Sequence, residues 1–549
     1  MKSNYTKELL VKYRKEICAN VILLILISVF SVSGPMFIRS AINSSVEEGI
    51  RFSLFVFFIL ILSATYLLKF AHHRFKFWFG KKFKTEETVN LYNKAFHMSY
   101  LKINSLEPTY ITERIGGTVS NVYNLFSSSI SGIFVSALTI ILLLIVTFNI
   151  NRVLALLYFV QIPLQYFGFQ KILNGKESPL AKIHTELQEI RGKYAKDMKA
   201  IMSDVNGIKQ FCDEGGLIGI IRKHVSFLNL KEKKGNQFAM DICIILEYIC
   251  MILKYITYIL IVYYMMIGRI RIGDLVYLSL INDLYFNSIG DVISIQVNLL
   301  NLYGSIEFVE NDINKNLEND GETDVLSVNR IFGNVTDVKY GDNILIEDAN
   351  IDIKRGDVVF FEGSSGAGKS TFVKLLNKFI SSDGLMIDSI PVSSVSNKSL
   401  RERIFYVPQN AYLLPGTLRE NICVGKEFDD KKWERLSELG FMKKFTDAKE
   451  GLDYKVLENA ANLSGGDRQK IILARAFMYS PDVIILDESL NSIDEESSNE
   501  IMNSILHMFK NRIIIIISHD SELEKYCNVK FLIQDKVLRQ SIIRTEVVV

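Results

Sequence analysis

The sequence predicts a membrane bundle of six transmembrane α-helices with long cytoplasmic extensions, joined to an α/β domain built around a phosphate-binding loop. Three observations support this fold class. The first part of the chain holds six long apolar runs, the composition turns soluble and alternating from about Val328, and a glycine-rich loop follows at Gly363. With 549 residues the chain is longer than one hydrophobic core usually organises, so we expect separate folded units.

Each apolar run is close to the length that a bilayer requires. A transmembrane helix needs about 20 apolar residues, and the runs cover residues 18–40, 53–71, 130–150, 153–172, 242–267 and 273–293. The first five are hydrophobic enough to be assigned from composition, and the sixth is weaker. The first run is followed by Arg39 rather than by a small-residue cleavage pattern, so we expect a retained span instead of a signal peptide.

Positive charge indicates the orientation of the spans. Lys and Arg are dense before the first span and in the segments after the second and fourth, whereas the connections on the opposite side are short: NSSVEEGIR, NINR and IGRIRIG. By the positive-inside rule, the N-terminus, both long segments and everything after the sixth span lie in the cytoplasm of a multi-pass protein of the cell membrane. We expect both long segments to be helical, since long loops usually carry structure.

Bulk composition excludes several other classes. The net charge is +2, which gives no basic surface for nucleic acid, so no nucleic-acid partner is expected. The six cysteines are scattered, without the close pairs of a zinc site or the density of a disulfide scaffold. We expect them to be reduced.

The stretch GSSGAGKST matches the phosphate-loop pattern, follows an expected strand and precedes the helix-like TFVKLLNKFI. In such loops backbone N–H groups wrap the phosphates, Lys369 approaches the outer phosphates and Ser370 offers its hydroxyl to Mg²⁺. We therefore expect a nucleotide and Mg²⁺ to bind here. The binding residues would be Gly363, Ser364, Ser365, Gly366, Ala367, Gly368, Lys369, Ser370 and Thr371.

Two apolar strands farther along the chain end in residues suited to nucleotide hydrolysis. DVIILDES places Asp487 and Glu488 at a strand end, and RIIIIISHD does the same for His519. Asp487 can hold Mg²⁺ through its waters, Glu488 can orient and polarise the attacking water, and an imidazole at His519 can meet the γ-phosphate. These residues predict an α/β P-loop NTPase cassette.

Directly before the carboxylate strand region stands NLSGGDRQ, and with this motif the chain resembles an ATP-binding-cassette (ABC) transporter. The whole arrangement is similar to the exporter-type half-transporters, a group that includes peptide and bacteriocin exporters. The resemblance implies a transmembrane domain over 1–310, a linker over 311–327 and a cassette over 328–549. It also implies ATP and Mg²⁺ as ligands, and a second half-transporter chain as partner in the lipid bilayer.

The resemblance assigns roles to further residues. Tyr340 matches the aromatic residue that stacks on adenine, Gln409 the glutamine that senses Mg²⁺, and His519 the switch histidine that acts with Glu488 and Lys369. Asp494 matches the loop that spans the dimer interface. The signature that closes on the ATP of the partner chain matches Ser464, Gly465 and Gly466.

One signature position departs from the family. The residue after the second glycine is usually glutamine and is Asp467 here. An extra negative charge near the partner's triphosphate should weaken closure unless it is paired or turned away. Both a homodimer and a heterodimer with a degenerate-site partner therefore stay open.

The sixth span carries a polar stripe at helical spacing. Its residues are Asp283, Asn287, Asp291, Ser294, Asn298 and Asn301. Asp283 falls near the depth of Lys254 in the preceding span, so the two can pair.

Glu247 and Asp291 would then remain as an acidic patch that faces the cytoplasm. This patch predicts a substrate cavity for cationic amphipathic cargo such as a basic peptide. The alternative is that the lower stripe lies below the bilayer and is simply hydrated.

The predicted function is ATP-driven export of a peptide or amphipathic small molecule across the cytoplasmic membrane by alternating access, with ATP hydrolysis by the cassette. A lipid flippase of the same family is an alternative. A non-pumping ATP-gated channel or regulator is a third possibility, disfavoured because Glu488 is present. No cysteine-protease domain precedes the first span, so we expect that this chain does not trim a leader peptide.

Overall fold

The computed structural model describes residues 4–48, 52–106, 108–170, 190, 197–202, 205–213, 215–340, 343–364, 366–380, 383–409, 412–490 and 495–543. The chain divides into two compact units. One comprises Met1–Met98 and Lys102–Leu317, and the other comprises Ser99–Leu101 and Glu318–Val549. The division after Leu317 falls in the segment 311–327, for which the sequence predicts a linker.

The described residues of the first unit form helices joined by short turns. Its elements are α1 (Asn4–Lys12), α2 (Arg14–Glu48), α3 (Phe52–Phe96), α4 (Tyr100–Leu106), α5 (Pro108–Asn124), the π-turn η1 (Leu125–Ser129), α6 (Ile130–Ile150), α7 (Arg152–Gln170), α9 (Val205–Phe211), α10 (Leu217–Met266), α11 (Ile272–Glu307), the π-turn η3 (Phe308–Ile313) and η4 (Asn314–Asn316). The six predicted spans fall on α2, α3, α6, α7, α10 and α11.

Four stretches of the described chain are long and apolar enough to cross a membrane. They are Arg14–Ser45, Phe52–Phe96, Pro108–Ile150 and Glu247–Met266, and Arg152–Pro163 is a shorter apolar helix. The helix α11 is not among them, in line with its weaker sequence signal. A bilayer requires every backbone polar group to be satisfied internally, which long helices achieve within each segment.

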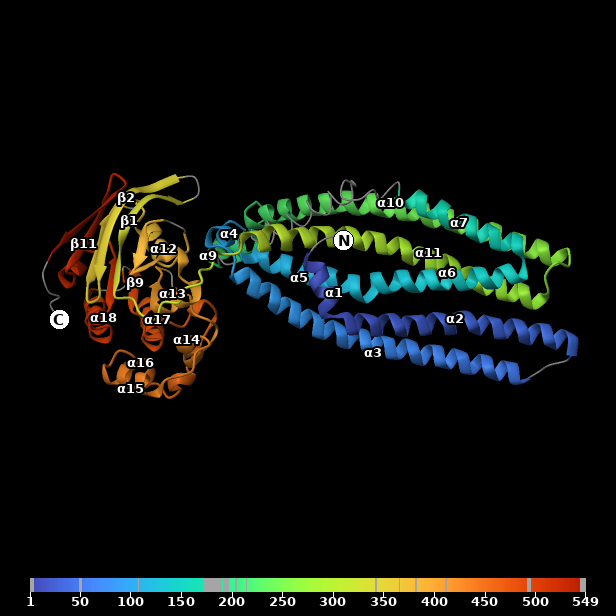
Figure 1. Cartoon of the computed structure of the whole chain (residues 1–549), viewed down its shortest axis with the longest axis horizontal. Coiled ribbons are helices and arrows are strands. Elements are labelled where there is room, and N and C mark those ends of the chain that lie inside the picture. The colour runs from blue at the N-terminus through green and yellow to red at the C-terminus, as the bar shows by residue number, and fades with distance from the viewer. Residues whose placement is uncertain are drawn as a thin grey trace. The chain divides into compact units, whose positions relative to one another are not determined.

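Helices α2, α3, α6 and α11 run alongside one another in the bundle (Figure 1). On α11, Tyr277, Ile281 and Tyr285 are buried in a core that also takes up Tyr158 of α7. The Tyr158 hydroxyl donates to the Asn282 side chain at 2.9 Å, and the Tyr285 hydroxyl donates to the Tyr158 carbonyl at 2.6 Å. Polar side chains of α11 thus bind neighbouring helices, because an unsatisfied polar group in an apolar surrounding is costly.

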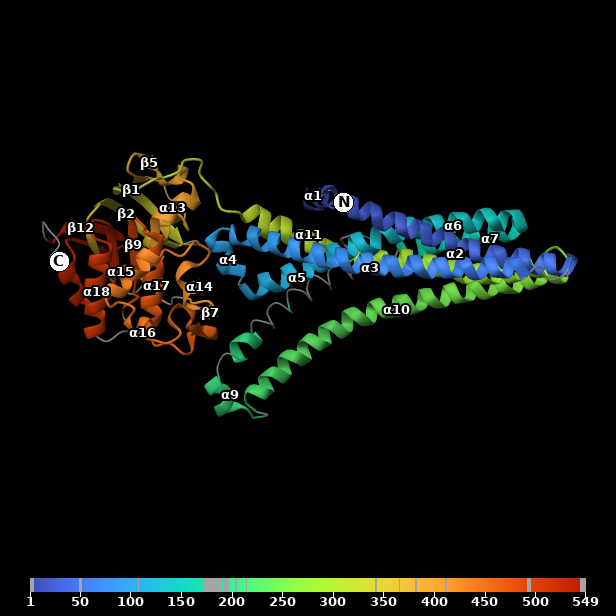
Figure 2. The ribbon, with the colours of Figure 1, turned by 90° about the horizontal axis from the view of Figure 1, so that it is seen from below.

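The helix α10 packs on α11 and α7, and its N-terminal part runs away from these helices and begins near α9 (Figure 2). Large apolar side chains on α10 are exposed on the single chain: Ile244, Ile245, Tyr248, Tyr255 and Ile259. Such a surface is suited to lipid or to a second protein.

The second unit is built on a ten-stranded sheet of order β5-β4-β1-β2-β12-β11-β3-β10-β9-β6. Its strands are β1 (Arg330–Tyr340), β2 (Asn343–Lys354), β3 (Val358–Gly363), β4 (Leu385–Ile387), β5 (Ile390–Pro391), β6 (Ile404–Val407), β9 (Val483–Asp487), β10 (Ile513–Ile517), β11 (Val529–Gln534) and β12 (Val537–Ile542). A separate pair joins β7 (Gly416–Thr417) and β8 (Lys455–Val456).

The helices of this unit are α12 (Lys369–Leu376), α13 (Asn397–Arg403), α14 (Leu418–Cys423), α15 (Asp430–Glu438), α16 (Lys443–Thr446), α17 (Gly465–Tyr479) and α18 (Glu495–Met508). Short 3-10 turns are η5 (Val392–Ser394), η6 (Gly451–Asp453), η7 (Glu458–Ala460) and η8 (Ser521–Tyr526).

The strands β6, β9, β10, β3 and β11 are parallel neighbours. All residues of β9 and β10 are buried, which explains their continuous apolar sequences, because both faces of a parallel sheet are covered. On β3, Val358 and Phe360 enter one core, and Val359 and Phe361 enter the other. The polar ends of these strands therefore meet at one edge of the sheet.

Candidate functional site

The phosphate loop connects β3 to α12. Gly366 and Gly368 have φ of +81° and +102°, a left-handed region that residues with a Cβ rarely adopt. Gly363 has extended backbone, and a Cβ there would lie 3.2 Å from the Ile533 carbonyl oxygen. The loop therefore needs glycine for conformation at two positions, and at the third there is little room for a side chain. Ser365 lies outside the described residues.

Lys369, the first residue of α12, is only 5% exposed. Its ammonium group donates to the carbonyl of Gly363 at 2.6 Å and to that of Ser364 at 3.3 Å. Burial lowers the pKa of Lys369, and the nearby carboxylates of Glu488 and Asp487 oppose that shift. The lysine is thus curled over the loop, where a phosphate oxygen can replace the two carbonyls as acceptor.

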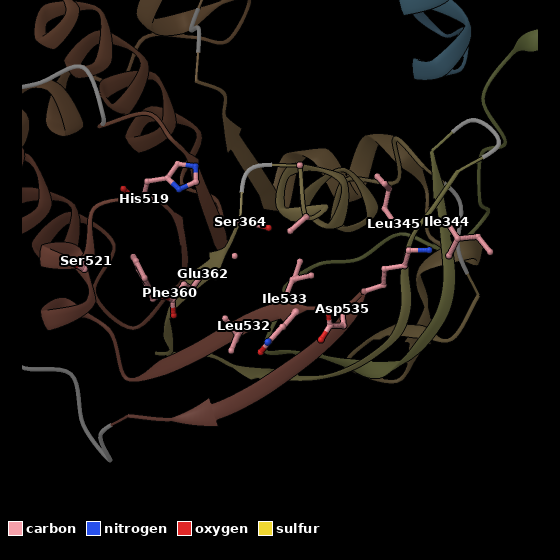
Figure 3. Close-up of a pocket in the computed structure, with 16 residues that line it drawn as sticks. Ile344, Leu345, Phe360, Glu362, Ser364, His519, Ser521, Leu532, Ile533 and Asp535 are labelled. Atoms are coloured by element: carbon pink, nitrogen blue, oxygen red, sulfur yellow. The ribbon is translucent and has the colours of Figure 1, made fainter.

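A pocket of about 570 Å³ opens beside the loop. Figure 3 shows Ser364 between His519 on one side and Ile344 and Leu345 on the other. Lys536 also lines this pocket and lies 3.2 Å from Glu347. The pocket therefore offers backbone and cationic groups to an anion and apolar groups to its organic part.

Strand pairing brings Asp487 to the loop. Its neighbour on β10 is Ile517, which pairs with Phe361 of β3. The Ser370 hydroxyl donates to Asp487 Oδ1 at 3.2 Å. Asp487 is buried, so this carboxylate and the hydroxyl form one polar corner of the site.

Tyr406 belongs to this corner and was not among the predicted site residues. Its hydroxyl donates to Asp487 Oδ2 at 2.7 Å. Burial and the adjacent Asp487 charge both raise the pKa of Tyr406, so the phenol stays protonated. The stretch YVPQ on the strand beside β9 is a signal that could have found it, since β6 pairs with β9 through Tyr406 and Ile485.

Three elements converge on Glu488. The Gln409 amide donates to Glu488 Oε2 at 2.9 Å, and His519 Nε2 lies 3.3 Å from Glu488 Oε1. The Glu488 backbone N–H donates to the Ile517 carbonyl at 2.8 Å, and its φ is +48°. A left-handed conformation at a residue with a Cβ costs free energy and is found preferentially at functional sites. The structure thus brings together Gln409, Glu488 and His519.

The signature is at the start of α17 and forms a separate cluster. Ser464 is the N-cap of this helix, followed by Gly465 and Gly466. Among the described residues, Ser464 makes its hydrogen bonds with Asp467 and with the Arg468 backbone N–H, and none of them goes to the phosphate loop. Asp467 forms an ion pair with Lys444, a second residue that was missing from the predicted site.

Several predicted positions cannot be placed in detail. Asp494 lies outside the described residues, and so do the side chains of Tyr340 at the end of β1 and Asp291 on α11. Thr371 is buried in α12 and Ala367 lines the pocket.

In the helical unit, Lys254 and Asp283 form the ion pair that the sequence suggested, with Nζ 2.5 Å from Oδ1. The Tyr258 hydroxyl also donates to Asp283, at 3.2 Å. On the single chain Glu247 and Asn287 are exposed. The cargo cavity itself stays a prediction.

The residues at the phosphate loop suit Mg²⁺ bound together with a nucleotide. No group of three or more His, Cys, Asp or Glu in the described residues could hold a metal alone. Mg²⁺ commonly binds through one or two carboxylates plus substrate phosphates. Asp487, the Ser370 hydroxyl and the Gln409 amide oxygen supply hard oxygen donors of that kind.

Comparison with known proteins identifies the domain that holds this site. The family model described as ABC transporter matches residues 346–491, which include the phosphate loop, the signature and both carboxylates. A relative from Bacillus subtilis (strain 168), the SPbeta prophage-derived sublancin-168-processing and transport ATP-binding protein SunT, is 32% identical over 267 residues. The chain carries an ABC transporter domain.

The match with SunT covers 46% of this chain and 37% of SunT, so the chain spans little more than a third of that relative's length. The transport/processing ATP-binding protein ComA of Streptococcus pneumoniae (strain ATCC BAA-255 / R6) is 24% identical, with 97% of this chain and 75% of ComA covered. A solved bacterial Atm1-family ABC exporter with ATP bound has the same fold, with a TM-score of 0.84 at 17% identity over 96% of this chain and 95% of that one.

Proposed function

We propose that the chain is one half of an ATP-driven exporter, in which two cassettes close on ATP and hydrolysis reopens them. The observation that carries this proposal is the convergence of Gln409 and His519 on Glu488, beside a phosphate loop onto which Lys369 folds back. The helical unit of the same chain, on which the six predicted spans fall, is the part that the cassette moves in this proposal.

Each residue of the site has a proposed task. Lys369 exchanges its two carbonyl partners for the outer phosphates of ATP. Ser370 and Asp487 hold Mg²⁺, which when bound neutralises phosphate charge. Glu488 orients the attacking water and takes up its proton, while His519 binds the γ-phosphate and Gln409 positions Glu488. Gln409 keeps its bond to the Glu488 carboxylate when His519 turns to the γ-phosphate, so the carboxylate stays oriented for hydrolysis.

Closure requires a second cassette. The signature cluster at Ser464 makes no bond to the loop of its own chain in the described residues, so we assign it to the ATP held by a partner chain. ATP between two cassettes then favours the closed pair, because it has a higher affinity for that state than for the open one. The exposed apolar surface of α10 gives the membrane units a surface for the same partner.

The cargo is proposed to be a peptide or amphipathic small molecule, with cationic groups facing Glu247 and Asp291. A lipid flippase of the same family would use the same cassette cycle. The channel alternative is disfavoured by the structure of the site, because Glu488 keeps the two partners that a hydrolytic carboxylate needs.

Crosslinking tests the two-cassette arrangement. The full chain with Glu488→Gln, Ala367→Cys and Ser464→Cys, with its native cysteines replaced by serine, is placed in lipid nanodiscs and oxidised. We expect a disulfide-linked dimer that forms with Mg-ATP and not with ADP, because only ATP brings the loop of one chain to the signature of the other.

Variants with only one of the two engineered cysteines are the controls and should stay monomeric on the gel. A doubly engineered chain that gives no ATP-dependent dimer, alone or with a co-expressed second half-transporter, would contradict the proposal.

A further inference from the structure

The acidic residue in the signature is held by three donors on one oxygen. Asp467 Oδ2 accepts from the Ser464 hydroxyl at 2.7 Å, from the Ser464 backbone N–H at 3.1 Å, and from Lys444 Nζ. Burial alone would raise the pKa of Asp467, but the bonds from Lys444 and Ser464 outweigh it and lower the pKa. The carboxylate is therefore an anion inside the signature, with its charge matched by one lysine.

The position of Lys444 is set by the core. The next residue of α16, Phe445, is 1% exposed and packs in the same core as Ile471 and Ile472 of α17. The backbone of α16 is thus fixed relative to the signature helix. The Lys444 side chain is 54% exposed and the Asp467 side chain 11%, so the lysine lies across the outer side of the buried carboxylate.

In this geometry Asp467 and a phosphate oxygen would compete for the proton of the Ser464 hydroxyl. The hydroxyl has one proton, which it gives to Asp467, while its oxygen accepts the Asp467 backbone N–H at 3.2 Å. To bind a phosphate oxygen, the hydroxyl must turn that proton away from the carboxylate. Lys444 remains on the same oxygen and keeps it satisfied, so the exchange does not leave a buried unpaired charge.

We propose that Lys444 is a positioning residue for the signature, neutralising Asp467 and freeing the Ser464 hydroxyl to bind ATP held by the second cassette. The proposal rests on the proposed function, since it needs a second cassette. It implies that this signature is active despite its aspartate, and that the Lys444–Asp467 pair replaces the uncharged glutamine usual at this position.

The test is a double-mutant cycle on ATP turnover of the full chain in nanodiscs, in the assembly that crosslinking identifies. Lys444→Met should lower turnover about tenfold, the loss expected for a hydrogen bond to a charged group. Asp467→Gln is the reference for the other side of the cycle, and its turnover is measured alongside. The double variant Lys444→Met with Asp467→Gln should turn over within about twofold of Asp467→Gln alone, because additivity fails for residues in contact.

Lys443→Met, an exposed lysine on the same helix, is the matched control and should not change turnover. Binding of a fluorescent ADP analogue to the chain's own phosphate loop should be equal in all variants, since Ser464 serves the partner's nucleotide. Normal turnover in Lys444→Met, or a double variant as slow as Lys444→Met, would overturn the inference. A wild-type chain without turnover would instead contradict the proposed function.

Discussion

The charged groups of the cassette and those of the membrane helices are held in different ways. Glu488 has partners from two other segments and a fixed backbone, and Asp487 has Ser370 and Tyr406. Asp283 has Lys254 and Tyr258, both from α10, and its side chain is 53% exposed on the single chain. Several fixed partners hold a carboxylate in the orientation that catalysis requires. A half-exposed ion pair balances charge, but its side chains can still change conformation.

The largest effect that this difference predicts is at Glu488. Glu488→Gln keeps the size of the side chain and removes the carboxylate that orients water, so the rate of ATP hydrolysis should fall by about 10³. Phosphate release by the full chain in nanodiscs measures it, and ATP binding should persist.

Glu362→Gln is a matched control. Glu362 lines the pocket beside the phosphate loop, but it pairs with Lys530 and not with Gln409 or His519. Equal losses in both variants, or sustained hydrolysis in Glu488→Gln, would show that another carboxylate is responsible.

An intermediate effect is expected at Tyr406. Tyr406→Phe removes the phenol that donates to Asp487 Oδ2, which leaves that oxygen without its protein donor and disturbs the Mg²⁺ corner. The Mg²⁺ concentration for half-maximal turnover should rise about tenfold, the size of a lost hydrogen bond to a charged group. A magnesium titration of ATPase activity measures the shift.

Tyr526→Phe is the control for that titration. It also removes a phenol hydrogen bond, to Asn499 at 3.0 Å, and lies away from Asp487. If the two variants have the same magnesium dependence, Tyr406 has only a structural role.

The cassette could be predicted from the sequence in much more detail than the membrane unit. Lys369, Asp487 and Glu488 stand at strand ends or helix starts whose positions follow from local sequence, and parallel strands bring those ends to one edge. Tyr406 and Lys444 were missed because their contacts depend on which strands and helices become neighbours. That information is absent from local patterns.

The polar stripe of α11 also shows what a local sequence pattern can and cannot predict. The pairing of Lys254 with Asp283 was predicted correctly, because each residue lies near the middle of its span and the two spans are adjacent. Helical spacing did not show that Asn282, one residue away from the stripe, is the buried residue that binds Tyr158. Periodicity gives the face of a helix, while the packing partners decide which polar residues are enclosed.

The smallest effect should come from the acidic patch. The apolar stretch of α10 begins at Glu247, so this carboxylate lies at the edge of the span and is exposed on the single chain. With the charge of Asp283 balanced by Lys254, our proposal leaves Glu247 and Asp291 to attract a cationic cargo. Glu247→Gln with Asp291→Asn should reduce the stimulation of ATPase activity by a cationic amphipathic peptide about twofold, the range of exposed ion pairs.

Asp241→Asn is the control, because Asp241 is exposed on the same helix about 9 Å nearer its N-terminus at 1.5 Å per residue, outside the apolar stretch. A difference between these variants at low salt that fades at high salt would place the cargo at the patch, since exposed charges are screened by salt. Equal stimulation of both would mean that the lower stripe is only hydrated surface. The fixed carboxylates of the cassette would then have a function that the exposed acids of the membrane helices lack. The contacts that select the cargo would lie elsewhere in the bundle.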